Sequence, residues 1–162
     1  MTKAYEPKPG DYGCVKTNGL MGKLIRLGTL SRWNHAFIYI GQGKIIEANP
    51  RGVEISLISK YPHIAWNRHE KINDIQREGI IWKAHQIIGK PYGFFLIIDL
   101  TLRILGLKIL ANTKFMKYLS TKNGYICSEL VAECYSHVQH PLFEKPDYLV
   151  TPGDLAERLI YQ

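Results

Sequence analysis

Two β-rich runs on either side of a glycine-containing turn restrict the first third of this chain to an antiparallel hairpin. The first run, His35–Ile40, is nearly all apolar after its histidine, which is typical of a buried strand. Gly41-Gln42-Gly43 leads into the second run, Lys44–Ala48, and three-residue hairpin loops commonly have glycine at their left-handed position. A loop of this length predicts that Ile40 pairs with Lys44.

The register of this hairpin decides which polar side chains share a face. In the predicted register Phe37 lies opposite Glu47, and His35 lies opposite Asn49. Because side chains alternate along a strand, Glu47 shares the face of His35 as its diagonal neighbour, roughly 7–8 Å away between backbones. A two-residue loop would place Glu47 on the opposite face. The hairpin therefore offers His35 either a carboxylate or an amide as a partner.

Short β-rich runs occupy the first half of the chain, and helical patterns occupy the second half. Strands are predicted over 12–16, 33–40, 44–48 and 52–57, with turns such as Pro9-Gly10-Asp11 between them. Helices are predicted over 19–28, 78–88 and 128–138, and another begins at Thr151-Pro152-Gly153-Asp154, which has an N-cap threonine. A length of 162 residues suits one domain. We expect a single α+β domain over residues 1–162, with a small antiparallel sheet or barrel packed against helices.

Composition and net charge restrict which binding partners and which cellular location we expect. Hydrophobic residues make up 46% and charged residues 22%, which is ordinary for a globular protein and excludes a disordered chain. The net charge of +7 favours an anionic cell-wall or membrane surface, because the lysines and arginines form no basic stripe with interleaved aromatics for specific nucleic-acid binding. The N-terminal segment lacks the apolar core of a secretory signal. The expectation is a protein that is cytoplasmic as made, with export or virion association by another route.

The apolar stretch Phe94–Leu110 is the one segment that resembles a membrane span. Asp99, Arg103 and Lys108 lie within it, and charges inside a bilayer are costly. We interpret this stretch as one or two buried or amphipathic helices. The alternative is an apolar surface for a lipid-like substrate or a membrane.

Three cysteines without a CxxC spacing match neither a disulfide framework nor a zinc finger. Cys127 lies at the start of the helix predicted over 128–138, where the helix dipole and unsatisfied backbone N–H groups favour a thiolate. The same N–H groups, including that of Ser128, can hold an oxyanion. The alternative for Cys127 is a small buried hydrophobe. Cys14 and Cys134 are interpreted as packing residues.

A cysteine nucleophile needs a base, and His35 differs from the other histidines because it begins a buried strand. Glu47 or Asn49 would orient its ring, which gives the third member of a nucleophile, base and orienter triad. The alternative is that His35 caps its strand and Glu47 is solvated. The five remaining histidines, His63, His69, His85, His137 and His140, show no metal-ligand spacing, so neither a metal nor a cofactor is expected.

Five segments carry a resemblance to a known family. They are PGDYG at 9–13, NHAFIYIGQGKIIEA at 34–48, GKPYG at 89–93, YICSELVA at 125–132 and VTPGDLA at 150–156. In this order they resemble the circularly permuted branch of the NlpC-like, papain-fold cysteine peptidases and amidases, the YiiX-like group. The resemblance implies a permuted papain-like domain.

The resemblance also implies roles for individual residues. Cys127 would be the nucleophile, His35 the base and Glu47 the residue that orients it, with Asn49 in reserve. Tyr12 and Tyr92 can offer a phenol near the cleft, or else are packed aromatics, and Tyr125 is a further candidate for substrate contact.

The expected activity is hydrolysis of an amide bond, in peptidoglycan-type peptides, through an acyl-enzyme. A lipid amidase, esterase or acyltransferase on the same fold is the alternative enzyme. A non-catalytic binding module with a basic surface is the alternative of another class.

Overall fold

Five strands and three α-helices form the described part of the chain. The computed structural model describes residues 5–18, 33–67, 71–94 and 124–160, together with positions 97 and 106. The strands are β1 (Tyr12–Val15), β2 (His35–Gly41), β3 (Lys44–Asn49), β4 (Gly52–Leu57) and β5 (Ala65–Trp66). The helices are α2 (Asp74–Ile87), α6 (Cys127–His137) and α7 (Pro152–Ile160), with short 3-10 helices η1 (Ile58–Lys60) and η2 (Asp147–Leu149).

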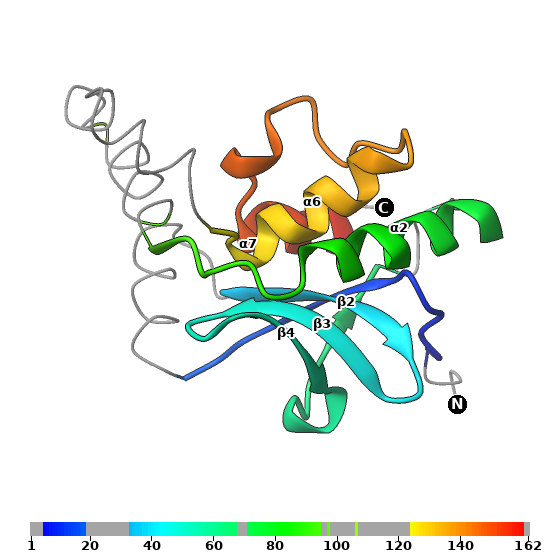
Figure 1. The fold of residues 1–162 in the computed structure, drawn as a ribbon, viewed down its shortest axis with the longest axis horizontal. Coiled ribbons are helices and arrows are strands. Elements are labelled where there is room, and N and C mark those ends of the chain that lie inside the picture. Colours follow the sequence, from blue (N-terminus) through cyan, green and yellow to red (C-terminus); the bar gives the residue numbers. More distant parts are fainter. Residues whose placement is uncertain are drawn as a thin grey trace.

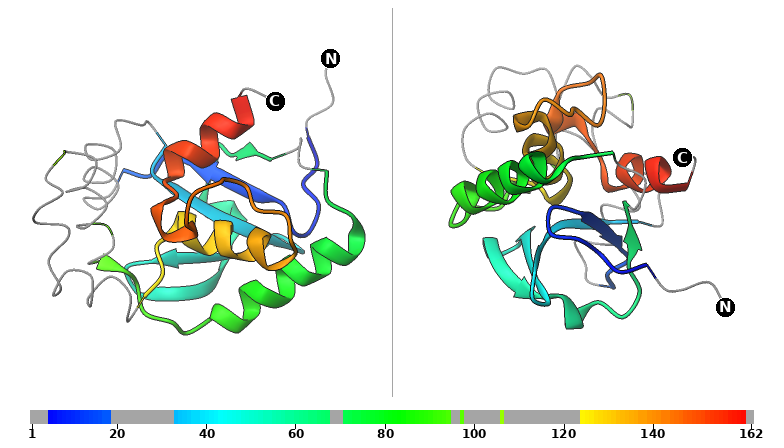
Figure 2. Two further views of the ribbon diagram at one scale, coloured as in Figure 1. Left: turned by 90° about the horizontal axis from the view of Figure 1, so that it is seen from above. Right: turned by 90° about the vertical axis from the view of Figure 1, so that its right-hand side faces the viewer.

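The strands form one antiparallel sheet in the order β4-β3-β2-β1-β5. Figures 1 and 2 show α2 and α6 lying side by side over one face of this sheet, with α7 beside α6. The predicted α+β class, with an antiparallel sheet packed against helices, is confirmed. The two-residue strand β5 was not predicted, because Ala65-Trp66 is too short to show a period.

The turn of the β2–β3 hairpin is one residue shorter than predicted. Gly41 pairs with Lys44, so the predicted pair of Ile40 with Lys44 is wrong. The loop consists of Gln42 and Gly43, whose φ angles are 53° and 69°. Two successive residues with positive φ match the twist of the flanking strands.

A β-bulge restores the predicted register beyond this turn. The register shifts between Tyr39 and Gly41, and from there on Tyr39 pairs with Ile45 as the three-residue loop predicted. The extra residue in β2 compensates for the residue missing from the loop. His35 and Glu47 therefore share a face, although the loop length alone would have separated them.

Side-chain caps fix where two of the helices begin. The α2 helix starts four residues before its predicted position, because Asn73 and Gln76 form a capping box with bonds of 2.8 and 3.0 Å. The apolar pattern used for the prediction does not detect such a cap. The start of α7 is confirmed: Thr151 Oγ1 accepts the N–H of Asp154 at 3.1 Å, and Asp154 accepts the N–H of Thr151 at 2.7 Å.

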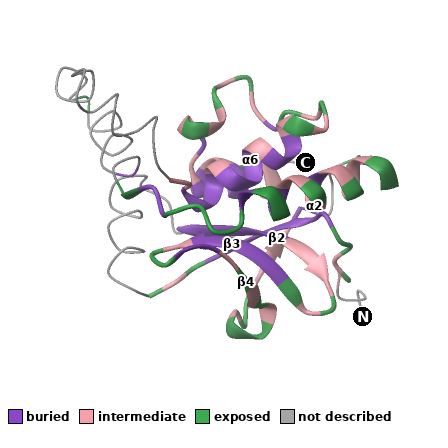
Figure 3. Cartoon of the chain, in the orientation of Figure 1, coloured by how far each residue is buried: buried purple, intermediate pink, exposed green. Residues whose placement is uncertain are grey.

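The main core lies between the sheet and the helices, and Figure 3 shows buried residues concentrated in β2, β3 and α6. Its largest fully buried side chains from these layers include Ile38, Ile46, Leu130 and Tyr135. A second, smaller cluster of Val15, Phe37 and Ile45 lies on the other face of the sheet. Tyr61, which follows η1, and Trp66 pack against this second cluster.

Two of the predicted motif segments lie against each other just before α6. The N–H of Gly93 donates to the carbonyl of Tyr125 at 3.0 Å, and the N–H of Tyr125 donates to that of Pro91 at 2.9 Å. Gly124 has a φ of 155°, and a Cβ there would lie 2.7 Å from backbone atoms of Tyr92 and Gly93. This close approach requires glycine and sets the path of the chain into Cys127.

Among the described residues, no helix is long and apolar enough to cross a membrane. The helix predicted over 19–28 lies outside them, as does most of the apolar stretch Phe94–Leu110.

Candidate active site

Cys127 is the first residue of α6, and its side chain is buried. The preceding residue, Ile126, has an extended backbone, and its N–H donates to the carboxyl group of Glu129 at 3.3 Å. The first N–H groups of an α-helix have no partner within the helix. Cys127 therefore lies at the positive end of an 11-residue helix, as the sequence predicted.

His35 is the first residue of β2 and contacts both other members of the predicted triad. Its Nε2 lies 2.6 Å from Glu47 Oε2. The Cys127 side chain lies close enough to this ring to raise the pKa of His35. Because Glu47 occupies Nε2, Nδ1 is the ring nitrogen that remains for the thiol. The three predicted side chains are therefore brought together from two strands and a helix.

Glu47 is fully buried and accepts hydrogen bonds from three side chains. Besides His35, the donors are the Lys60 ammonium and the Tyr61 hydroxyl, whose oxygen lies 2.6 Å from Glu47 Oε2. Burial alone raises the pKa of Glu47, but the hydrogen bonds from His35 and Lys60 outweigh it and hold the pKa well below its usual range. Glu47 is therefore a carboxylate at neutral pH.

The environment of His35 favours its charged form. Burial lowers the pKa of His35, but the interactions with Cys127 and Glu47 outweigh it and raise the pKa to about 9. An imidazolium between a sulfur and a carboxylate is the arrangement that stabilises a thiolate.

Lys60 and Tyr61 belong to the site although no sequence pattern indicates them. Both lie at or after the end of η1, outside any periodic pattern, and only the return of the chain over the sheet brings them to Glu47. The Tyr61 ring stacks on Phe37 with 5.4 Å between centroids, and it lies 5.7 Å from the His35 ring. Burial raises the pKa of Tyr61, and Glu47 raises it further, so the phenol stays a donor.

Asn49 does not orient His35, which corrects the reserve prediction. Its amide nitrogen donates to Glu54 at 2.7 Å, and its amide oxygen accepts the N–H of Arg51 at 2.9 Å. Both bonds are local to the turn between β3 and β4. The carboxylate of Glu47 reaches His35 from the diagonal position, so no partner directly opposite is needed.

Tyr12 and Ser128 are buried among core groups. The Tyr12 hydroxyl donates to the carbonyl of Leu155 at 3.3 Å, and its ring packs edge-on against Tyr135, so Tyr12 is a packed aromatic residue. The Ser128 hydroxyl donates to the carbonyl of Val150 at 2.5 Å. This bond ties α6 to the segment before α7 and leaves only the backbone N–H of Ser128 for an oxyanion.

Tyr92 and Tyr125 form an isolated parallel bridge just before the start of α6 at Cys127. Tyr92 is buried, and burial followed by the nearby Cys127 charge raises the pKa of its phenol. Tyr125 is partly exposed, and burial together with Glu133, which lies further along α6, raises the pKa of its phenol. Tyr92 is thus the one of the two that lies near the thiol.

The other cysteines are buried free thiols, in agreement with their interpretation as packing residues. Burial raises the pKa of Cys14 and that of Cys134. Both thiols therefore stay protonated and unreactive.

The remaining described histidines are dispersed. His85 Nδ1 lies 2.8 Å from the carbonyl of Ile81, and His137 stacks on Trp82. His63 lines a cavity described below, the His140 ring lies near Tyr135, and His69 is outside the described residues.

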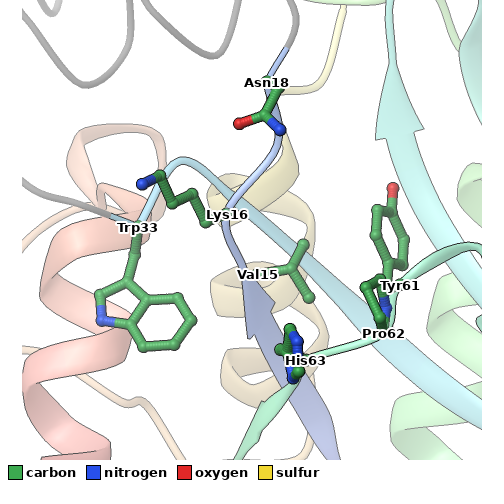
Figure 4. Close-up of a pocket in the computed structure, with 7 residues that line it drawn as sticks. All are labelled: Val15, Lys16, Asn18, Trp33, Tyr61, Pro62 and His63. Carbon is green, nitrogen blue, oxygen red and sulfur yellow. The ribbon is translucent and has the colours of Figure 1, made fainter.

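A cavity of about 560 Å³, whose lining residues are shown in Figure 4, lies beside the triad. Val15 and Tyr61 connect the two, because Val15 is the strand partner of His35 and the Tyr61 ring contacts that of His35. The cavity is lined by Val15, Lys16, Asn18, Trp33, Tyr61, Pro62 and His63.

Comparison of the fold with solved structures finds a similar protein. The crystal structure of YiiX from Escherichia coli O157:H7, described as a metalloprotein and DUF1105, matches 83% of this chain and 67% of its own at a TM-score of 0.60. The chain has a YiiX-like fold. Sequence identity to YiiX is only 18%, so the likeness concerns the fold alone. No family model matches the chain, and no curated protein matches it in sequence.

Proposed function

We propose that the protein is a cysteine hydrolase on a circularly permuted NlpC-like, papain-type fold, and that it cleaves an amide bond in peptidoglycan-type peptides. The observation that carries the proposal is the contact of His35 with both the Cys127 thiol and the buried Glu47 carboxylate. The YiiX-like fold and the five motif segments support the same family.

The first half of the reaction forms an acyl-enzyme. The Cys127 thiolate attacks the carbonyl carbon, an S–C bond forms, and the carbonyl electron pair moves onto the oxygen. Backbone N–H groups at the start of α6 donate to this oxyanion. When the carbonyl re-forms, the C–N bond breaks, and the His35 imidazolium gives its proton to the departing amine.

The second half releases the acid. His35, now neutral, takes a proton from water as the water oxygen attacks the thioester carbon. Collapse of the second oxyanion breaks the S–C bond and frees the thiolate, while the proton on His35 restores the imidazolium. Glu47 holds the ring through Nε2 in both halves.

The residues of the triad do not match a metal site, although YiiX is described as a metalloprotein. The Glu47 oxygens already accept from His35, Lys60 and Tyr61, and a cation there would lie against the Lys60 ammonium. Among the described residues no group of three or more His, Cys, Asp or Glu side chains is placed to hold a metal ion. No step of the reaction is therefore assigned to a metal.

Product analysis tests the proposal and separates it from lipid chemistry. The protein is incubated with purified peptidoglycan and, separately, with acyl phospholipid, and the products are identified by mass. We expect new amine and carboxyl ends in the peptidoglycan sample, no product with Cys127→Ser and undiminished product with Cys134→Ser, a buried thiol of the same helix. Release or transfer of an acyl chain from the lipid alone would replace the amidase proposal with the lipid alternative.

A further inference from the structure

The cavity beside His35 contains three polar side chains that take no part in the triad. They are Lys16, Asn18 and His63. In the described ranges none of these three side chains has a hydrogen-bond or ion-pair partner. The neighbouring Asn34, by contrast, is engaged in bonds to the backbone of Thr17 at 2.8 and 2.9 Å. The cavity thus presents uncommitted polar groups at the edge of the candidate active site.

The other described residues that line the cavity are apolar or aromatic, and none of the described lining residues carries a carboxylate. In Figure 4 the Lys16 and Trp33 side chains lie to one side of Val15, and the Tyr61 ring lies to the other. The Tyr61 hydroxyl donates to Glu47, which is fully buried and already bonded to three donors. Glu47 therefore does not neutralise Lys16, and the cavity combines aromatic walls with an available positive charge.

The position of the cavity relates it to the scissile bond. Val15 pairs with His35 across the β1–β2 ladder, and the Tyr61 ring centroid lies 5.7 Å from that of His35. A substrate with its carbonyl carbon at Cys127 and its amide nitrogen near His35 would reach the cavity with the next group along its chain. The volume of about 560 Å³ is within the usual range for small-molecule sites, roughly 300–1,000 Å³.

We propose that this cavity is a substrate subsite for an aromatic or apolar group that carries a carboxylate, next to the amide bond cleaved at Cys127. Lys16 binds the carboxylate, Asn18 and His63 supply hydrogen bonds, and Trp33 and Tyr61 contact the apolar part. The substrate class is therefore acidic acyl-amides and short peptides with a free carboxyl group. This inference rests on the proposed function, because it places the subsite beside a reactive Cys127.

A pair of matched thiol probes tests the subsite without knowledge of the natural substrate. N-iodoacetyl-phenylalanine and its carboxamide both alkylate a thiolate with loss of iodide, and they differ only in the negative charge. The second-order rate of Cys127 alkylation is measured for each probe in the intact protein, and the modified residue is located by peptide mass spectrometry. We expect the acid to react faster than the carboxamide.

Lys16 is exposed, and its charge-neutral variant Lys16→Gln should lower the acid-to-carboxamide rate ratio by about fivefold, the upper end for an exposed ion pair. Lys16→Glu should lower the ratio further. The matched control is Lys44→Gln, an exposed lysine at the opposite end of the β2–β3 hairpin, which should leave the ratio unchanged.

The outcomes separate this inference from the proposed function. Equal ratios in the wild type, Lys16→Gln and Lys44→Gln would overturn the subsite while leaving the nucleophile intact. A carboxamide that reacts faster than the acid in the wild type would likewise overturn it. Failure of both probes to alkylate Cys127 faster than the buried Cys14 and Cys134 would instead overturn the proposed function.

Discussion

Replacing Glu47 by Gln removes one negative charge from the site and preserves the shape of the side chain. The amide oxygen of the variant can still accept the hydrogen bond that His35 Nε2 now donates at 2.6 Å. The burial of His35, which disfavours its charged form, is unchanged. The perturbation therefore isolates the contribution of the Glu47 charge to the imidazolium.

The size of the effect follows from the pKa of His35, which is raised to about 9 by Cys127 and Glu47 against burial. An opposite charge in direct contact typically changes a pKa by about 1–3 pH units. Loss of the Glu47 charge should lower the midpoint of the His35 titration by about two pH units, to near pH 7, which corresponds to about 3 kcal/mol. At pH 8 the protonated fraction then falls from about nine-tenths to about one-tenth.

Alkylation of Cys127 by iodoacetate and by iodoacetamide gives the assay. The imidazolium attracts the anionic reagent, so the ratio of the two rates decreases as His35 loses its proton. We expect this decrease near pH 9 in the wild type and near pH 7 in Glu47→Gln. A midpoint that stays near pH 9 in Glu47→Gln would refute the role of Glu47.

Two further variants control this experiment. Glu54 is the residue opposite Glu47 in the register of β3 and β4. Glu54→Gln removes this second carboxylate and should leave the midpoint of the His35 titration near pH 9. Lys60→Met removes a cation from Glu47 but keeps the carboxylate, so the midpoint should not fall. Melting temperatures of all variants establish that they are folded.

Three further outcomes are expected. The raised pKa of His35 stabilises the fold fully below about pH 6.5, and this contribution is lost as the pH rises through about 9. The lowered pKa of Glu47 stabilises the fold above about pH 4.5, and this contribution is lost in stronger acid. Both contributions are complete between about pH 4.5 and about pH 6.5, so the melting-temperature difference between wild type and Glu47→Gln should be largest there. A difference that grows above about pH 9 would contradict this. Gly124→Ala should lower both the melting temperature and the rate of Cys127 alkylation, because the new Cβ would lie 2.7 Å from backbone atoms. The control Gly89→Ala has open space around its Cβ, so it should cost only about 1 kcal/mol of backbone strain. Leu130→Ala in the core should lower the free energy of unfolding by about 2–5 kcal/mol in denaturant titration, and a loss below 1 kcal/mol would contradict its complete burial.

The hairpin illustrates how far local sequence patterns predict this fold. The register predicted from the loop, together with the alternation of side chains along each strand, placed His35 and Glu47 on one face, and the structure agrees. The loop length was wrong by one residue, and the β-bulge between Tyr39 and Gly41 compensated for it. Burial constrains the register as well as the turn does, because a slip of one residue would exchange the side chains of the main core with those of the second cluster on the other face.

The starts of the helices also show how far local sequence patterns predict this fold. The start of α6 at Cys127 and that of α7 after Thr151 were within reach of local patterns, because an apolar stripe and a capping box lie within a few residues. The start of α2 was predicted four residues late, since the Asn73–Gln76 cap precedes the apolar pattern.

The sequence by itself singled out Cys127, His35 and Glu47 as candidates for nucleophile, base and orienting carboxylate, because each is marked by its place at the start of a helix, at the head of a buried strand or at a matching strand position. Only the tertiary structure decided what surrounds them. Lys60 and Tyr61 reach Glu47 because η1 returns over the sheet, and Lys16 and Trp33 line one cavity that no sequence periodicity predicts. Contacts between distant segments depend on the packing of whole elements, whereas periodicity records only which face of one element is buried.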